Sequence, residues 1–221
     1  MPHFCCPKYV LRFLSELTAW DSLTQQTANL CLIPASVTFF PIEMDCSYDL
    51  DLEADVIRAA HVYLVHPVNL ILQCIYPWLN IRCKSEVTWT EGKVHSRPDM
   101  SWQYNETIFA VLEFKHPYSI DYSEWLDAMT GEGEVIGNGS QIVKQLKKYG
   151  YYARTPYVAV FDWNALVLLK LGGNMADWKN DNERKPPATA GQYVWVEQDN
   201  VVRLKLLFFL MEALQWRISS S

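Results

Sequence analysis

Residues 98–115 read PDMSWQYNETIFAVLEFK, and this stretch decides the fold. Its second half, residues 107–115, is rich in β-branched and aromatic side chains, which is typical of a strand. Asn105–Glu106 is a turn signal that separates it from a second strand-like run at residues 95–104, and residues 81–92 form a third. We therefore expect a three-strand meander over residues 81–115.

Helices and further strands are expected around this meander. Within the helix at 140–154, Ser140 is the expected N-cap and Gly150 marks the expected exit. The order of elements predicts an α/β fold, in which helices cover the faces of a mixed sheet. The apolar periodicity places helices at residues 8–18, 51–65, 67–77, 123–129, 140–154 and 199–216, and later strands at 155–162, 164–171 and 192–197.

Length and composition favour one globular domain. The chain has 221 residues, of which 50% are hydrophobic and 20% charged, so it can fill a core and is not disordered. No apolar run reaches the roughly 18 residues that a membrane span needs, so we expect no membrane partner. We divide the domain into an N-terminal helical or irregular extension (1–48), a core (49–171), and a loop, strand and C-terminal helix that complete the fold (172–221).

The acidic residues are unevenly distributed. The net charge is −6, from 19 basic and 25 acidic residues, and taken alone it argues against nucleic-acid binding. However, residues 43–55 contain six acids and residues 116–136 contain five, with no Lys or Arg in either stretch. The rest of the chain is therefore basic, with 19 bases against 14 acids. Solvated acidic loops are the simpler interpretation of the two stretches.

Cysteine usage and the N-terminus favour an intracellular protein, either cytoplasmic or nuclear. The six cysteines include no C-x-x-C pair, and the N-terminal residues show no recognisable secretory signal. Buried thiols in a reducing compartment are the simpler reading.

Three short motifs carry the candidate chemistry. Asp99 follows Pro98; Glu113 and Lys115 lie two apart on a strand and share a face; and Gln145 and Tyr149 lie four apart on a helix. If the strands pair through Asn105–Glu106, the carboxylates of Asp99 and Glu113 converge, and such oxygens suit Mg²⁺ or Mn²⁺. The carbonyl of Phe114 is a further candidate ligand, and Lys115 could orient or deprotonate the attacking water.

Each motif also has a structural interpretation. Asp99 could cap a turn, Glu113 and Lys115 could be a solvent-facing pair, and Gln145 and Tyr149 could be ordinary helix-surface residues. These readings explain each motif singly, but they explain poorly why all three occur together.

The three motifs together resemble the PD-(D/E)XK nuclease superfamily. Pro98–Asp99 matches the PD, Glu113-Phe114-Lys115 matches the (D/E)XK, and residues 145–149 (QLKKY) match the Gln-hydrophobic-x-x-Tyr motif of its RecB-like branch. The resemblance covers roughly residues 50–171. It implies a three-layer α/β/α core of the restriction-endonuclease type, and a Mg²⁺- or Mn²⁺-dependent nuclease acting on phosphodiester bonds, most simply in DNA. It also implies an acidic metal ligand on the helix before the meander, for which Glu53 is the first candidate and Asp55 the second.

Other functions and partners stay open at this stage. The chain could be a catalytically weak binding or regulatory module of the same fold, or a toxin- or effector-type nuclease. We expect Lys144, Lys147 and Lys148 to bind the phosphate backbone, and a homodimer is a further possibility. The aromatic residues of the C-terminal part, including Phe208 and Phe209, are expected in the core rather than on a dimer face.

Overall fold

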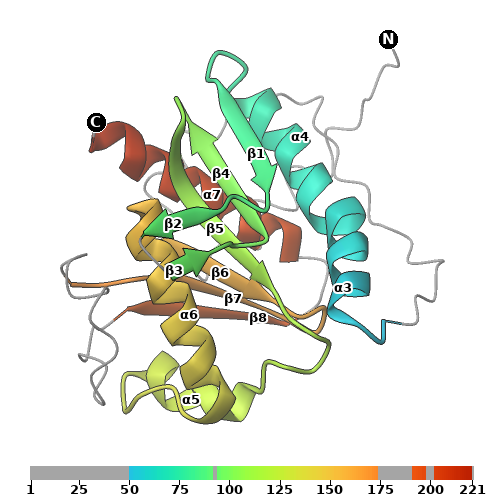
Figure 1. Cartoon of the computed structure of the whole chain (residues 1–221), viewed down its shortest axis with the longest axis vertical. Helices are drawn as coiled ribbons and strands as arrows, with labels where there is room; N and C mark the ends of the chain where they lie inside the picture. Colours follow the sequence, from blue (N-terminus) through green and yellow to red (C-terminus); the bar gives the residue numbers. More distant parts are fainter. Residues whose placement is uncertain (1–49, 92–93, 174–190, 198–201, 221) are drawn as a thin grey trace, which may run out of the picture.

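The computed structural model describes residues 50–91, 94–173, 191–197 and 202–220. Its centre is a six-stranded sheet with the strand order β1-β4-β5-β6-β7-β8 (Figure 1). The expected helix at 8–18 and most of the expected loop at 172–190 lie outside the described residues. Within the described part of the chain, no helix is long and apolar enough to cross a membrane.

The sheet is mixed. Strands β5 and β6 run parallel, and the other neighbouring pairs are antiparallel. The expected strands at 81–92 and 95–104 each divide in two. Along the chain, the residues between β1 and β4 form a separate two-stranded hairpin, β2–β3. The strands are β1 (Ile81–Ser85), β2 (Trp89–Glu91), β3 (Val94–Ser96), β4 (Met100–Tyr104), β5 (Thr107–Phe114), β6 (Tyr157–Phe161), β7 (Ala165–Lys170) and β8 (Gln192–Glu197).

The hairpin β4–β5 has the expected turn and sets the register of the site. Asn105 and Glu106 both have positive φ, 47° and 66°, as the two central residues of a type I′ turn require. Near the other end of the hairpin Met100 pairs with Leu112. The residue before Met100 is Asp99 and the residue after Leu112 is Glu113, so this register brings the two acids to the same end of the hairpin.

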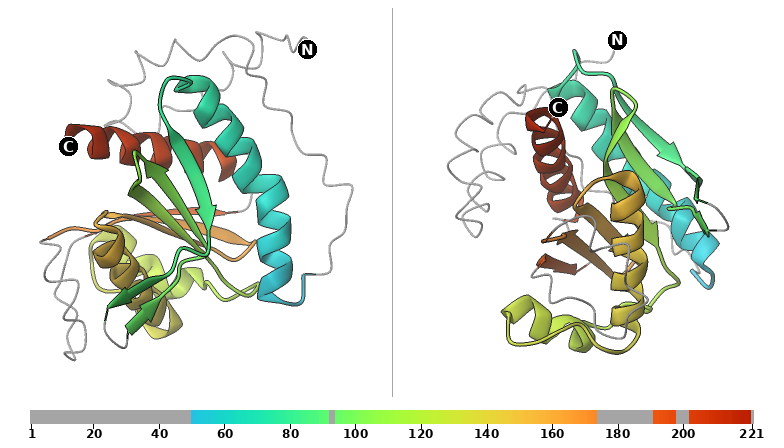
Figure 2. Two further views of the ribbon diagram at one scale, coloured as in Figure 1. Left: turned by 45° about the horizontal axis from the view of Figure 1, so that its top comes forward. Right: turned by 60° about the vertical axis from the view of Figure 1, so that its left-hand side comes forward.

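Helices cover both faces of the sheet, as the sequence predicts for an α/β fold. On β5, Leu112 and Phe114 pack into the cluster formed with α3, α4 and α7, whereas Val111 packs against α6. Glu113 shares its face with Val111 because side chains alternate along a strand. Figure 2 shows α7 on one side of the later strands, with α5 and α6 on the other. The helices are α3 (Glu53–Ala60), α4 (His66–Ile75), α5 (Tyr122–Thr130), α6 (Gly137–Ala153) and α7 (Val202–Ser219).

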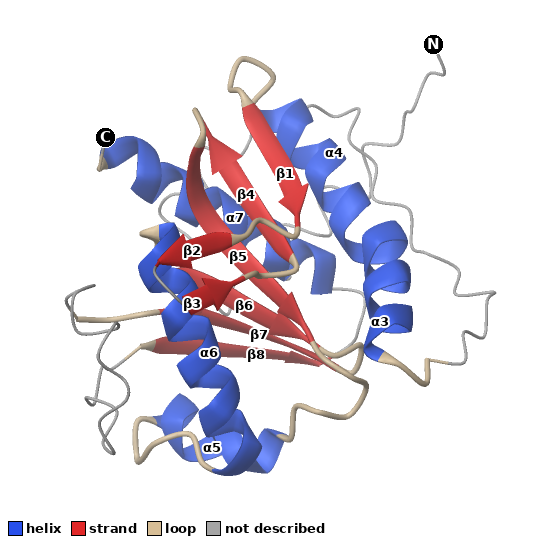
Figure 3. Cartoon of the chain, in the orientation of Figure 1, coloured by secondary structure: helices blue, strands red, loops and turns tan. Residues whose placement is uncertain are grey.

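The predicted break between helices at 51–65 and 67–77 is wrong. A π-helical segment, η3 (His61–Val65), joins α3 to α4 without interruption (Figure 3). Pro67 has no N–H to donate to the carbonyl of Tyr63, four residues earlier. The side chain of Arg203 on α7 donates to that carbonyl instead, so the helix continues with its backbone oxygen satisfied.

Two local expectations for helix 140–154 are also corrected. The helix begins earlier, with Ile136 as N-cap, so Ser140 lies inside it. Gly150 is likewise internal, and the helix ends at Arg154, which adopts the left-handed conformation. The expectation for the C-terminal aromatics is confirmed for Phe208 and Phe209, which are buried in the core.

Candidate active site

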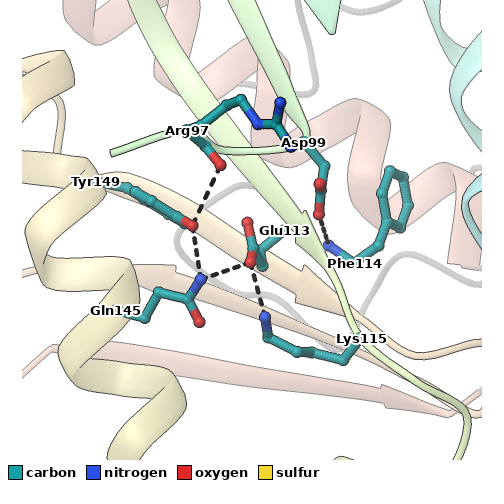
Figure 4. A network of polar contacts seen from close by, with 7 residues as sticks. All are labelled: Arg97, Asp99, Glu113, Phe114, Lys115, Gln145 and Tyr149. Carbon is teal, nitrogen blue, oxygen red and sulfur yellow. Dashed lines mark hydrogen bonds and ion pairs between the residues drawn. The ribbon is translucent and has the colours of Figure 1, made fainter. Parts of the chain in front are cut away.

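The candidate site lies where β5 ends beside the start of β4. Asp99 directly precedes β4, and its Oδ2 accepts a hydrogen bond of 2.7 Å from the backbone N–H of Phe114, the last residue of β5 (Figure 4). This bond ties the PD motif to the middle residue of the E-x-K motif across the hairpin. The expectation that Asp99 lies close to the end of the strand carrying Glu113 is therefore confirmed.

Glu113 is the centre of the polar network. It is 5% exposed, and its Oε1 accepts hydrogen bonds from Lys115 Nζ at 2.7 Å and from Gln145 Nε2 at 2.6 Å (Figure 4). Its other oxygen, Oε2, is buried and has no hydrogen-bond partner among the residues that the structure describes. A buried carboxylate oxygen without a partner is costly, so Oε2 is a place where a cation or a donor from a ligand would be stabilised.

Helix α6 supplies the third motif. Gln145 and Tyr149 lie one turn apart, and Gln145 Nε2 also donates to the Tyr149 hydroxyl at 2.6 Å. That hydroxyl donates in turn to the carbonyl of Arg97 at 3.4 Å. The helix is thus linked both to Glu113 and to the segment that leads into Asp99.

The carboxyl groups of the site are electrostatically coupled. Burial, and after it the charge of Asp99, raises the pKa of Glu113 to about 7, against the opposing effect of Lys115. Burial also raises the pKa of Asp99, and the N–H of Phe114 opposes it. Burial and then the charge of Glu113 raise the pKa of Tyr149, so its hydroxyl stays protonated. A buried carboxyl whose ionisation is disfavoured by a neighbouring carboxylate would be stabilised in its charged form by a cation.

The two candidate acids on the preceding helix have different surroundings. Glu53, the first residue of α3, is exposed and lies close enough to Asp99 to contribute to the rise in its pKa. Asp55 already has hydrogen-bond partners at the start of the helix, where its carboxylate accepts from Leu52 N at 3.1 Å and from the Arg58 side chain at 3.4 Å. The structure therefore places Glu53, rather than Asp55, near the candidate site.

The lysines expected to bind phosphate are not equivalent. Lys144 and Lys148 are half-buried on α6, whereas Lys147 is only 4% exposed. A side chain with so little exposure cannot take part in an open phosphate-binding surface in this conformation, so we withdraw Lys147 from that role. The role of the other two lysines stays a prediction.

Arg97 is a residue of the site that the motifs did not single out. Its carbonyl accepts from Tyr149, and its guanidinium, with a side chain 60% exposed, lies 3.7 Å from Glu86 and contributes to the electrostatics of Asp99. The available signal was its position, immediately before Pro98–Asp99. An exposed guanidinium next to the candidate site is suited to meet a phosphate.

The residues present are compatible with a divalent cation. Asp99 and Glu113 offer carboxylates, and the partnerless Oε2 of Glu113 is the kind of hard oxygen that Mg²⁺ and Mn²⁺ bind. Among the residues that the structure describes, however, no group of three or more His, Cys, Asp or Glu is placed to hold a metal. A cation here would therefore need the carbonyl of Phe114, water, or a reoriented Glu53 to complete its shell.

Known proteins give no independent guide to this site. No family model, no curated protein and no solved structure matches the chain.

Proposed function

We propose that the protein is a Mg²⁺- or Mn²⁺-dependent nuclease with a restriction-endonuclease-like core, hydrolysing phosphodiester bonds, most simply in DNA. One observation carries the proposal: the buried Glu113 carboxylate is fixed through Oε1 by Lys115 and Gln145, while Oε2 is left without a partner. A pair of donors that orients one oxygen and leaves the other free is suited to presenting that oxygen to a ligand.

The metal would be held by Asp99, Glu113 and the carbonyl of Phe114, with Glu53 near enough to contribute. When bound, such an ion lowers the pKa of a water molecule and stabilises the charge that develops on the phosphate. The N–H of Phe114 already orients Asp99 by its 2.7 Å hydrogen bond, so this carboxylate is held in place before any ligand arrives.

Lys115 is the residue proposed to act on the attacking water. Its ammonium lies 2.7 Å from Glu113 Oε1, and its side chain is 19% exposed, so it joins the buried carboxylate to solvent. In that position it can orient a water by hydrogen bonding and place positive charge beside the phosphate in the transition state. Gln145 and Tyr149 are positioning residues, since they act on Glu113 and on the backbone at Arg97.

The proposed substrate contacts are basic side chains near the network. Arg97, Lys144 and Lys148 are the candidates for binding phosphates, and an intracellular setting, cytoplasmic or nuclear, would give access to DNA. A homodimer, the other expectation, would be detected by light scattering during size-exclusion chromatography.

The direct test is cleavage of plasmid and single-stranded DNA with Mg²⁺, Mn²⁺ or chelator. We expect metal-dependent cutting that Glu113→Gln abolishes. Glu106→Gln is the matched control, because it makes the same change at the opposite end of β5, in the turn with β4. Cutting that survives in Glu113→Gln, or no cutting by the parent with either metal, would overturn the proposal.

A binding or regulatory module is the second candidate. One observation favours it: among the described residues, no group of three metal-ligating side chains is placed to hold an ion. Retained oligonucleotide binding without cleavage under any metal condition would select this alternative.

A further inference from the structure

A tight turn follows directly after β5 and the candidate site. Ser119 N donates to the carbonyl of His116 at 3.1 Å, which closes a four-residue turn over His116–Ser119. Pro117 is the second residue of this turn, and Tyr118 is the third, with φ of 62°. These features are those of a type II turn, whose third position favours glycine because φ is positive there. A tyrosine at this position is a conformational outlier.

The turn is held firmly at its base. Ile120 N donates to the buried Asp162 at 2.8 Å, and Asn138 Nδ2 donates to the carbonyl of Ser119 at 2.9 Å. Pro117 and Ile120, on either side of the tip, are both buried. The surrounding structure therefore imposes the unfavourable conformation of Tyr118, which is how such outliers persist at functional positions.

The ring of Tyr118 is held in water. Its exposed fraction of 83% is the highest among the large hydrophobic side chains of the described residues. A side chain with so few packing contacts contributes little to the stability of the fold, and its residue occupies a position that favours glycine. An exposed ring on a backbone that the fold holds in place is suited to a stacking contact with a planar ligand.

The position of Tyr118 relates this ring to the candidate chemistry. Tyr118 lies three positions after Lys115, so their Cα atoms lie no more than about 11 Å apart. Figure 3 shows the connection from β5 to α5 leaving the carboxyl end of β5, where Glu113 and Lys115 lie. A nucleic-acid strand with a phosphate at Lys115 would therefore have a neighbouring nucleotide within reach of the ring.

We propose that Tyr118 stacks on an unpaired nucleobase, so that the substrate is single-stranded nucleic acid or an unpaired segment of a duplex. This inference rests on the proposed nuclease function. In a duplex the faces of internal bases are covered by their neighbours, so a ring at the surface can stack only on a base that is out of the helix.

Binding is tested by fluorescence anisotropy, with Mg²⁺ present, in a full-length Glu113→Gln parent, which is expected not to cut and which keeps Lys115. The probes are short oligonucleotides of single-stranded DNA, single-stranded RNA and blunt duplex DNA. In this parent, Tyr118→Ala should weaken binding to a single-stranded probe about tenfold or more, while Tyr118→Phe should retain it. The salt dependence should be unchanged, because no phosphate contact is removed.

Two further variants separate stacking from folding. Tyr118→Gly should raise the melting temperature, since glycine accepts the positive φ, and yet weaken single-strand binding as Tyr118→Ala does. Trp78→Ala is the matched control: this residue is 74% exposed and lies between α4 and β1, a connection that Figure 1 places far from the carboxyl end of β5. It should leave binding unchanged.

Three results would overturn the inference: unchanged single-strand binding in Tyr118→Ala, equal loss on single-stranded and duplex probes, or no binding of any probe by the parent. Cleavage by the wild-type chain is scored separately. Metal-dependent cleavage with no effect of Tyr118→Ala on binding leaves the nuclease proposal standing and removes this inference. Selective single-strand binding without cleavage leaves the stacking inference standing and removes the nuclease proposal.

Discussion

At the scale of single residues, Glu113 is the central group of the candidate site, and its environment combines favourable and unfavourable contacts for a charged carboxylate. It is buried beside a second carboxyl, yet one of its oxygens has two donors and the other has none. Packing alone does not call for a glutamate here, since the neighbouring β5 residues on the same face, such as Val111, are apolar. The network therefore imposes a cost on folding that can be measured by changing pH.

Glu113 predicts a specific pH dependence of stability in the presence of chelator. Its pKa is raised from 4.5 to about 7 in the folded state, so the folded protein holds this proton more tightly than the unfolded chain. Its contribution to the free energy of unfolding is therefore present below pH 4.5 and is lost as pH rises through about 7. The loss amounts to about 3 kcal/mol at most.

Urea denaturation of wild type and Glu113→Gln at pH 5 and pH 8 checks this prediction. The variant should gain stability relative to wild type at the higher pH, because its amide does not ionise. A stability difference that is the same at both pH values would contradict the assignment of a raised pKa.

Lys115→Ala should abolish cleavage, and its effect on stability should depend on pH. The sequence alone suggests an exposed strand lysine whose removal changes stability by no more than about 0.5 kcal/mol. Because the structure pairs Lys115 with the buried Glu113, its removal raises the pKa of Glu113 further and leaves a less compensated charge above pH 7. The variant should therefore lose more stability at pH 8 than at pH 5.

Lys84→Ala is the control for this variant, because Lys84 is an exposed lysine on β1 of the same sheet. It should leave cleavage and stability unchanged at both pH values. Cleavage retained in Lys115→Ala would remove the lysine from the proposed mechanism.

At the scale of elements, the start of α6 shows how one helix positions another. Its N-cap, Ile136, has no side-chain oxygen to offer the first turn, and the carboxylate of Glu124 on α5 accepts from Asn138 N at 2.9 Å and Gly139 N at 2.6 Å. The free N–H groups that a phosphate could use are thereby occupied by a side chain of the protein. This contact fixes α6, and so fixes Gln145 and Tyr149 relative to the sheet.

Removing this cap should destabilise the fold. Glu124→Ala should cost about 1–2 kcal/mol, since it removes two charge-assisted hydrogen bonds at a helix N-terminus. Glu132→Ala is the control, an exposed acid in the same acidic stretch that should change stability by less than about 0.5 kcal/mol. Thermal or urea denaturation measures both, and equal effects of the two variants would show that the cap is unimportant.

Gly137, the first residue of α6, is also required for the contact between Glu124 and the start of the helix. Its φ is +57°, and a Cβ there would lie 2.1 Å from Glu124 Oε1. Gly137→Ala must therefore move the carboxylate and strain the backbone. We expect it to lower the melting temperature at least as much as Glu124→Ala.

At the scale of the whole molecule, the candidate metal site joins parts of the chain that are far apart in sequence. Glu53 comes from α3, Asp99 precedes β4, and Glu113 lies on β5, between the two helical layers of the sheet. An ion held by these groups would bind the folded state and not the unfolded chain. Metal binding should therefore appear as a gain in global stability.

We expect Mn²⁺ at saturating concentration to raise the melting temperature at pH 8. At a hundredfold excess over Kd the stabilisation is about 2.7 kcal/mol. The shift should shrink at pH 5, because the raised pKa of Glu113 leaves that carboxyl protonated and unable to bind.

Asp99→Asn and Glu113→Gln should each remove the metal-dependent shift in melting temperature, and Glu106→Gln should keep it. Calorimetric titration with Mn²⁺ provides the matching binding measurement. A shift that persists in Glu113→Gln would place the ion elsewhere.

The sequence by itself determined the type and order of most of the elements. The strand at 192–197 and the turn at Asn105–Glu106 are found as predicted, because side-chain alternation and turn chemistry are local properties. The turn alone would pair Met100 with Val111, and the irregularity between Trp102 and Gln103 moves this partner to Leu112. The turn therefore brings the two acidic motifs to the same end of the hairpin, but the folded structure sets the register that places Asp99 opposite Glu113.

Only the tertiary structure decided which partners these elements meet. Arg203 satisfies the carbonyl that Pro67 cannot, Glu124 caps α6 in place of Ser140, and the packing of α6 buries Lys147. In the first two cases the interacting groups lie far apart in the sequence, and in all three the outcome depends on how helices pack. Local periodicity carries no information about such contacts, because they are selected by the requirement that the folded chain bury its apolar surface while satisfying its polar groups.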